Sequence, residues 1–302
     1  MKQSTQTAAA AESMTPTERR AALSLASIFS LRMLGLFMIL PVFSLYAHQL
    51  QGVTPALIGI AIGIYGLSQA VLQIPFGMLS DRVGRRPVIA FGMLVFAVGS
   101  AVAAMSHSIG GVILGRALQG TGAVAAVVMA LAADLTREEH RTKAMALIGT
   151  TIGMSFVASL VLGPILNQWI GVPGIFWLTS VLGLFGIVVL QMWVPRAAHV
   201  RFHHDTQAVP AQLSTVLKNG QLARIDLCIF ALHMMLTATF VVMPLVLRDH
   251  VGLPSSHHWY IYLPVMLFTL VIMVPLVIIA EKKRRMKQML MGSVVVLALA
   301  EF

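Results

Sequence analysis

The chain has 302 residues, of which 58% are hydrophobic and only 11% charged, and its formal net charge is +10. A soluble domain carries roughly a quarter charged residues, so this composition excludes an ordinary soluble protein. Residues 33–80, 144–195 and 250–280 contain no Asp, Glu, Lys or Arg. A membrane-spanning helix needs about 20 mostly apolar residues, and these runs are continuous rather than alternating, which favours helices.

Turn signals divide the apolar sequence into a series of predicted spans. The first follows a polar start in which Thr15, Pro16 and Glu18 form a capping-box pattern. The predicted helices lie at 20–46, 55–80, 87–106, 109–133, 143–167, 173–194, 224–247 and 258–280, and a ninth begins near 288. The fold class predicted is therefore an all-α polytopic membrane protein.

The basic residues predict the orientation of these spans. With the N-terminus in the cytoplasm, every Lys and Arg except Arg32, Arg116 and Arg248 falls in a cytoplasmic segment, which is 18 of 21. The positive-inside rule therefore predicts a cytoplasmic N-terminus. The positive charge then faces cytoplasm and anionic lipid, so it is not an indication of nucleic-acid binding.

Two weak internal repeats indicate how the chain is organised. "FMILPV" at 37–42 recurs as "FVVMPL" at 240–245, and "SDRVGRR" at 80–86 recurs as "AEKKRRM" at 280–286. Two six-helix halves in parallel repeat would give such spacing. We expect a six-helix N-terminal half at 1–194, a cytoplasmic linker at 195–223, and an incomplete C-terminal half at 224–302, comprising helices seven and eight and the start of nine.

The stretch "FGMLSDRVGRRPV" at 76–88 places four charges between two apolar helices. Gly77 is expected to permit close helix contact, and Gly84 a tight turn with positive φ. Asp81 at a helix C-terminus opposes the macrodipole, so it should pair with a cation such as Arg85. Asp134 is a second acid at the same depth. An ordinary basic loop would explain the arginines but not the acid or the two glycines.

At this stretch the sequence resembles the major facilitator superfamily of secondary transporters. "GMLSDRVGRRPVI" at 77–89 matches that family's loop signature between the second and third helices, and "RALQGTGA" at 116–123 resembles its fourth-helix signature. The first helix and the "REEHRTKAMA" segment look like the bacterial YajR-type members. The resemblance implies a two-half helix bundle whose outward-facing state is locked by a gating motif. Here that motif comprises Gly77, Asp81, Arg82, Gly84, Arg85, Arg86 and Asp134.

A signature of drug–proton antiporters is present only in part. Its fifth-helix glycine–proline pattern appears as "SLVLGPILNQ" at 159–168, where Gly163 and Pro164 match but Ser159, Asn167 and Gln168 replace glycines. A Gly-Pro kink that eases helix packing explains this stretch equally well.

Two arginines lie inside predicted spans, where an ionisable residue is costly and indicates function. Arg32 lies about 18 Å along the first helix from Arg20 at 1.5 Å per residue, near the middle of a core about 30 Å thick. Arg116 is about 13 Å deep by the same measure, and its alternative role is a structural hydrogen bond to loop carbonyls. The further residues expected to line the same substrate or coupling cavity are Tyr65, Gln69, Gln73 and Gln119.

Proton coupling usually requires a titratable group, yet the predicted spans of the first half contain no carboxylate in mid-membrane. His233 in the seventh helix is a candidate because an unperturbed histidine has a pKa near 6.5. A polar group satisfied by a neighbouring helix is the alternative. No metal site and no cofactor are expected.

These features predict a secondary active transporter in the bacterial inner membrane. It would move a small-molecule substrate by alternating access, in proton-coupled efflux, and act as a monomer in the lipid bilayer. The family has about 12 helices, so a truncated, non-transporting membrane protein is one alternative. A membrane-embedded enzyme is another, although the sequence has no His-Glu-x-x-His, no phosphate loop and no paired acids within spans.

Overall fold

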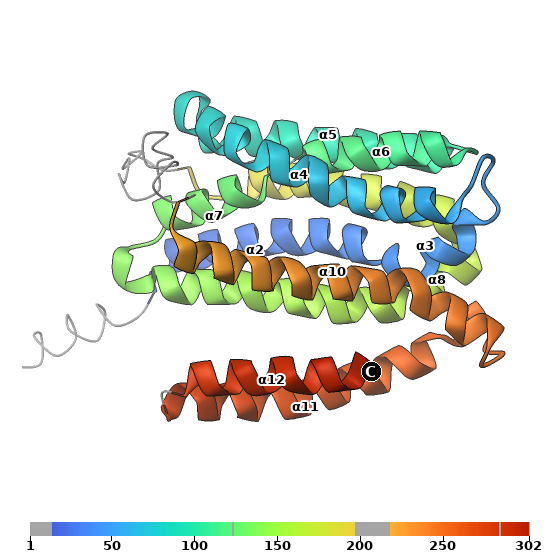
Figure 1. The fold of residues 1–302 in the computed structure, drawn as a ribbon. Coiled ribbons are helices and arrows are strands. Elements are labelled where there is room, and N and C mark those ends of the chain that lie inside the picture. Colours follow the sequence, from blue (N-terminus) through green and yellow to red (C-terminus); the bar gives the residue numbers. More distant parts are fainter. Residues whose placement is uncertain (1–13, 123, 197–217, 284, 302) are drawn as a thin grey trace, which may run out of the picture.

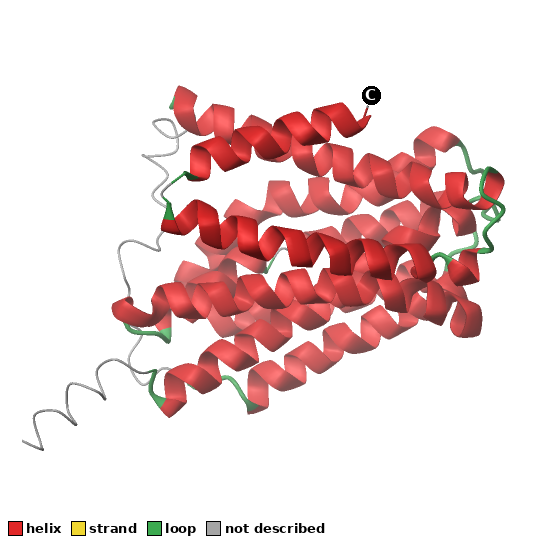
Figure 2. Cartoon of the chain, turned by 90° about the horizontal axis from the view of Figure 1, so that it is seen from below, coloured by secondary structure: helices red, strands yellow, loops and turns green. Residues whose placement is uncertain are grey.

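The computed structural model describes residues 14–122, 124–196, 218–283 and 285–301. Within these ranges the regular structure is helical, with one isolated bridge between Gln51 and Ser108. The helices run roughly parallel or antiparallel in one bundle (Figure 1; Figure 2). They are α2 (Pro16–Phe37), α3 (Leu40–Ala47), α4 (Pro55–Val83), α5 (Arg85–Met105), α6 (Ile109–Thr121), α7 (Ala125–Asp134), α8 (Glu138–Met192), α10 (Gly220–Asp249), the 3-10 turn η2 (Ser255–His257), α11 (Trp259–Lys282) and α12 (Met286–Glu301).

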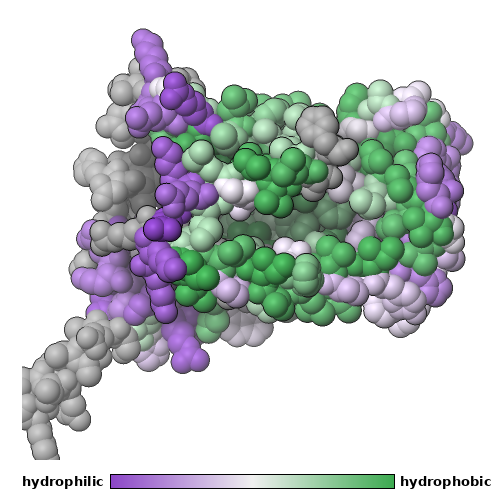
Figure 3. Space-filling model, turned by 60° about the horizontal axis from the view of Figure 1, so that its bottom comes forward, coloured by the Kyte–Doolittle hydropathy of each residue, from purple (hydrophilic) through white to green (hydrophobic). Residues whose placement is uncertain are grey.

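These helices confirm the all-α membrane fold predicted from composition. In the described ranges, seven helical stretches are long and apolar enough to cross a membrane. Apolar side chains form a belt between two more polar ends (Figure 3). Most of the predicted linker at 195–223 lies outside the described residues, and the division of the chain into halves stays a prediction.

The first span is interrupted rather than continuous as predicted. It begins with the expected capping box, in which the Glu18 N–H donates to Thr15 Oγ1 at 3.2 Å and the Thr15 N–H donates to Glu18 Oε2 at 2.8 Å. α2 then ends at Phe37 and α3 begins at Leu40. Pro41 has no N–H to donate to the carbonyl one turn earlier, which accounts for the interruption.

The fourth span is also interrupted, and the fifth and sixth are joined. α6 ends at Thr121 with Gly122 as its cap, and α7 begins at Ala125. α8 runs through 55 residues but contains one non-helical residue, Gly171, with φ 65°. A positive φ suits glycine because it has no Cβ. This kink divides α8 into the two spans that the sequence predicts.

The interior has two apolar clusters with a polar layer between them. One cluster lies toward the end of the bundle that carries Asp81 and includes Leu25, Ile89, Leu131 and Leu190. The other lies toward the opposite end and includes Phe43, Ile58, Val112 and Phe176. α2 packs against α8, α5 against α6 and α8, and α4 against α6. The interior polar layer comprises Arg32, Tyr65, Gln69, Ser100, Arg116 and Gln119.

α10 and α11 meet the first six spans mainly toward the end opposite Asp81. The Ser44 hydroxyl of α3 donates to the Phe240 carbonyl of α10 at 3.4 Å. The rings of Phe156 and Phe240 meet edge to face with centroids 5.9 Å apart. Leu160, Phe240, Leu247 and Tyr262 form a small buried cluster across α8, α10 and α11.

Candidate functional site

The charged residues of the 76–88 stretch form a compact ionic cluster at one end of the bundle. Asp81 lies in the last turn of α4, Arg85 begins α5, and Asp134 ends α7. Arg85 Nη1 pairs with the Asp81 carboxylate, and Arg85 Nε lies 3.2 Å from Asp134 Oδ2. Arg85 also donates to Ser80 Oγ at 2.6 Å. One guanidinium therefore joins the ends of three helices through partly buried ion pairs.

The two glycines of this stretch differ in what the structure requires of them. Gly84 has φ 103°, so the predicted positive-φ turn is confirmed. The expected close helix contact at Gly77 is wrong for the described part of the chain, because a Cβ there would meet nothing within 4 Å. The reason is that α4 is poorly buried along its length, and this glycine does not face a neighbouring helix.

Arg82 and Arg86 have different surroundings although they flank the same turn. Arg82 is exposed. Arg86 donates to the carbonyls of Leu190 and Val194 at 2.7 and 2.8 Å, at the end of α8. Arg20 donates to the carbonyls of Met192 and Trp193 at the same place. The last carbonyls of a helix lack intrahelical partners and carry partial negative charge, so these two arginines cap α8.

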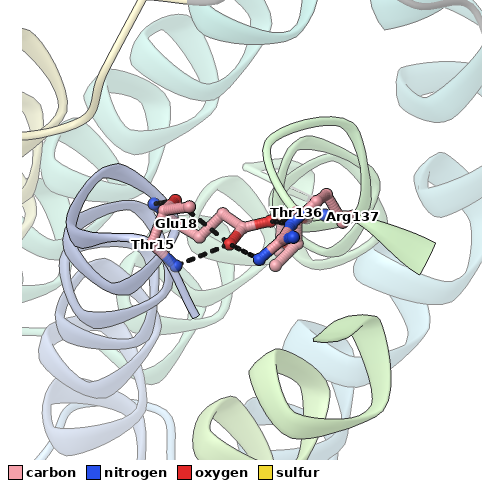
Figure 4. A network of polar contacts seen from close by, with 5 residues as sticks. Thr15, Glu18, Thr136 and Arg137 are labelled. Atoms are coloured by element: carbon pink, nitrogen blue, oxygen red, sulfur yellow. Dashed lines mark hydrogen bonds and ion pairs between the residues drawn. The ribbon is translucent and has the colours of Figure 1, made fainter. Parts of the chain in front are cut away.

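A second ionic contact, which was not predicted from the sequence, joins α2 to the turn before α8 (Figure 4). Glu18 Oε1 accepts from the backbone N–H and Nε of Arg137, each at 2.9 Å, and Oε2 accepts from Nη2 at 3.2 Å. The hydrogen bonds that the Arg137 guanidinium donates to Glu18 raise the pKa of that guanidinium. The sequence showed only the local role of Glu18 in the capping box, because its second partner is 119 residues away.

Arg116 is buried in the interior polar layer and its donors are occupied. Its side chain is 2% exposed. Nε donates to the carbonyl of Ala61 at 3.2 Å, Nη1 to Gln119 Oε1 at 3.0 Å, and Nη2 to the carbonyl of Ile62 at 3.5 Å. Gln119 in turn donates to Ser100 Oγ at 2.6 Å. This geometry favours the structural role for Arg116, with one difference from the expectation. The carbonyls that accept its hydrogen bonds belong to α4 and not to a loop.

Arg32 is equally buried but far less well paired. Its side chain is 1% exposed, and Nη2 donates to Gln69 Oε1 at 2.7 Å. Among the described residues, neither Nε nor Nη1 has a hydrogen-bond partner. The guanidinium carbon lies 5.7 Å from the ring centroids of Tyr65 and Phe96, within the range of cation–π attraction.

The predicted stripe on α4 faces this layer in part. The Tyr65 ring lies between the two arginines, with Arg116 5.1 Å from its centroid. Tyr65 Oη and Gln73 Oε1 are buried with no partner in the described part of the chain. Gln69 and Gln73 are half-buried. Tyr65 therefore contacts both arginines, and Gln69 accepts a hydrogen bond from Arg32. That these residues line a substrate or coupling cavity stays a prediction.

His233 and the glycine–proline pair lie elsewhere. His233 is on an exposed face of α10, where its Nδ1 lies 2.9 Å from the Ile229 carbonyl of the same helix, so it is outside the interior polar layer. Gly163 and Pro164 are buried in α8. A Cβ at Gly163 would lie 2.5 Å from the Met38 carbonyl oxygen, so this glycine lets α8 approach the interruption between α2 and α3.

Comparison with known proteins gives a consistent result. Residues 7–300 match the family model described as Major Facilitator Superfamily. The chain is 50% identical over 288 residues to the inner membrane transport protein YajR of Escherichia coli K12, covering 95% of this chain but 63% of that protein. It is 28% identical over 150 residues to the class B tetracycline resistance protein of Escherichia coli, covering 49% and 37%.

Solved structures agree at the level of the fold. An inward-facing, unoccupied bacterial homologue of the human lysosomal transporter Spinster superposes with a TM-score of 0.68 at 14% identity, covering 89% of this chain and 64% of that one. A D-xylose–proton symporter superposes with a TM-score of 0.56 at 15% identity, covering 86% and 69%. The chain thus spans just under two thirds of the length of the YajR protein that it resembles.

Proposed function

The chain belongs to the major facilitator superfamily, and from that membership we propose that it is a secondary active transporter that moves a small solute across the bacterial inner membrane by alternating access. The observation that carries the proposal is the ionic cluster of Asp81, Arg85 and Asp134. All three helices belong to the predicted N-terminal half, and partly buried ion pairs between their ends are a discrete, breakable contact through which the positions of these helices can differ between two access states.

The ionic cluster is proposed as a gate that favours one of the two access states. Its three members lie on α4, α5 and α7, at the end of the bundle where α10 and α11 make few contacts with the first six spans. The described contacts with α10 instead lie toward the opposite end, at Ser44 and Phe240. A structure joined at one end and separated at the other fits one state of an alternating-access cycle.

Coupling to protons and an outward direction of transport are part of the proposal. They are supported by the similarity to the tetracycline resistance protein and to a multidrug resistance protein, MdtL of Shewanella oneidensis, which is 30% identical over 176 residues. The cytoplasmic N-terminus follows from the positive-inside rule. We also propose that the protein acts as a monomer and that the chain divides at 195–223 into two halves.

The test is transport by the purified full chain in proteoliposomes with an imposed pH gradient. Internal pH is followed with an enclosed dye while labelled solutes, tetracycline among them, are added outside. We expect at least one solute to move together with a change in proton flux. Failure of every solute to move, with the protein correctly reconstituted, would contradict transport by this chain.

The Asp81→Asn variant then tests the gate. Asparagine keeps the size of the side chain but removes the charge that pairs with Arg85, so transport should slow while the amount of reconstituted protein stays the same. Asp226→Asn is the matched control, because Asp226 is exposed on α10. Wild-type transport by Asp81→Asn would refute the gating role.

A further inference from the structure

We propose that Arg32 binds an anionic group, a carboxylate or a phosphate, carried by the solute that this protein transports. The inference rests on the transporter function proposed above and adds a substrate class to it. It starts from the contrast between the two buried arginines of the interior polar layer.

The first observation is the unused hydrogen-bonding capacity of Arg32. A guanidinium has five N–H donors in a planar fork, and this side chain is 1% exposed. Only Nη2 has a partner, Gln69 Oε1, and both Nε and Nη1 lack one in the described part of the chain. Buried polar groups are almost always hydrogen-bonded, and an unpaired one requires an explanation. An anionic group that accepts from these donors would supply one.

The second observation is the charge of the surrounding helices. Residues 19–80, 82–133 and 140–204 contain no Asp or Glu, so the first six spans hold two arginines between their ends and no carboxylate to balance them. A charged side chain inside a membrane normally pairs or faces a water-filled pathway. Each guanidinium nitrogen of Arg116 has an acceptor, Gln119 Oε1 or a carbonyl of α4, whereas two guanidinium nitrogens of Arg32 have none among the described residues.

The third observation is the chemistry around those free donors. The rings of Tyr65 and Phe96 each lie 5.7 Å from the guanidinium carbon, and Tyr65 Oη has no partner among the described residues. The planar fork of an arginine suits bidentate binding of a carboxylate or phosphate. The aromatic walls suit an apolar or aromatic body attached to that group.

We infer that an anion would reach Arg32 from the α4 side of the bundle. α4 is the least buried of the first five apolar helices, and Gln69, which covers Nη2, is only half-buried. Rotation of the Gln69 side chain would release Nη2. An entering anion would then replace a neutral acceptor with a charged one, and charge-assisted hydrogen bonds are roughly twice as strong as neutral ones.

The test compares two probes of the same shape, benzoate and its neutral amide benzamide. The purified full chain in detergent is titrated with each, and its thermal unfolding is followed by tryptophan fluorescence. A ligand that binds the native state raises the unfolding midpoint in proportion to its affinity. We expect benzoate to raise the midpoint of the wild-type protein and benzamide to leave it nearly unchanged.

Substitutions then assign the effect to one residue. Arg32→Gln should weaken the apparent affinity for benzoate by about tenfold or more, and Arg32→Lys, which keeps the charge, should retain part of it. Arg19→Gln is the matched control, because it removes the same charge from an exposed position on the same helix and should bind benzoate as the wild type does.

Three results of the titrations without added lipid would overturn the proposal. They are an equal effect of benzoate and benzamide on the wild type, full benzoate binding by Arg32→Gln, and an equal stabilisation by chloride, which would make Arg32 an inorganic-anion site. The same titration is repeated with phosphatidylglycerol or phosphatidylcholine added to the detergent. If phosphatidylglycerol alone stabilises the wild type but not Arg32→Gln, and abolishes the benzoate effect, the occupant is a lipid and the proposal fails.

The outcome is separable from that of the proposed function. Solute flux in proteoliposomes without benzoate binding would leave the transporter function standing and refute the anionic substrate class. Benzoate binding that depends on Arg32, without flux of any solute, would leave the site standing and refute transport.

Discussion

Replacing Arg116 by methionine should destabilise the protein, whereas the same replacement of Arg32 should not. Both side chains are buried, with exposed fractions of 2% and 1%, and methionine fills a similar elongated space with an apolar chain. The difference lies in what each guanidinium leaves behind. Without Arg116, Gln119 Oε1 loses its donor at a fully buried position. Without Arg32, the acceptor that is released is the half-buried Gln69.

The magnitudes follow from these partners. A buried acceptor left without a hydrogen bond costs about 1–3 kcal/mol, so Arg116→Met should lower the free energy of unfolding by about that amount. Arg32→Met removes one hydrogen bond and two cation–π contacts at 5.7 Å. It also removes a buried charge with two unpaired guanidinium nitrogens, and replacing buried charges with apolar residues is often neutral or stabilising. We expect no loss of stability, or a gain.

The measurement is the midpoint of thermal unfolding of the purified chain in detergent, without added ligand, compared between the two variants and the wild type. Equal losses in both variants would refute the conclusion that Arg116 is structurally paired and Arg32 is not. A larger loss for Arg32→Met would show that Arg32 stabilises the bundle. A structural role would then explain the buried arginine at this position without a ligand.

Two further predictions concern glycines, each with a control on the same helix or turn. Gly163→Ala should lower the unfolding midpoint, because the added Cβ would lie 2.5 Å from the Met38 carbonyl oxygen and such overpacking costs about 1–3 kcal/mol. The control Gly153→Ala should not lower the midpoint, because a Cβ at Gly153 meets nothing within 4 Å. Equal losses in the two variants would contradict the close approach at Gly163. Gly84→Ala should also lower the midpoint, because a φ of 103° at this position costs a residue with a Cβ about 1–3 kcal/mol. The control Gly77→Ala should be neutral or slightly stabilising, because a Cβ there meets nothing within 4 Å. An unchanged midpoint for Gly84→Ala would refute strain at the turn.

Much of the fold could be predicted because a membrane leaves few solutions for an apolar chain. Continuous uncharged runs at 33–80 and 144–195 each had to hold two spans, and α8 with its kink at Gly171 divides where expected. The interruptions after Phe37 and Thr121 were not predicted. They occur inside apolar sequence, where hydropathy gives no boundary, although Pro41 and Gly122 could have indicated them.

The candidate site could be predicted where charge stands out against an apolar background. Asp81, Arg85 and Asp134 lie at helix ends of the same depth, so their association followed from topology and the resemblance to a known signature. The contact between Glu18 and Arg137 did not follow, because both lie among other charges at helix ends and nothing in the sequence selects one partner. Arg116 has hydrogen-bond acceptors because two carbonyls of α4 lie within reach of its guanidinium. Distances of this kind between helices could not be predicted from the sequence.

The two interruptions of the membrane helices have a consequence for motion. The interruption after α2 begins at Met38, six residues beyond Arg32, and that after α6 begins at Gly122, six residues beyond Arg116. α2 and α6 run in opposite directions. α2 starts at the end of the bundle that carries Asp134, whereas α6 runs toward that end. One interruption of the helices therefore lies on each side of the layer that holds the arginines. If either end of the bundle tilted at its own interruption, the helix segments that carry the two guanidinium groups would keep their places between them.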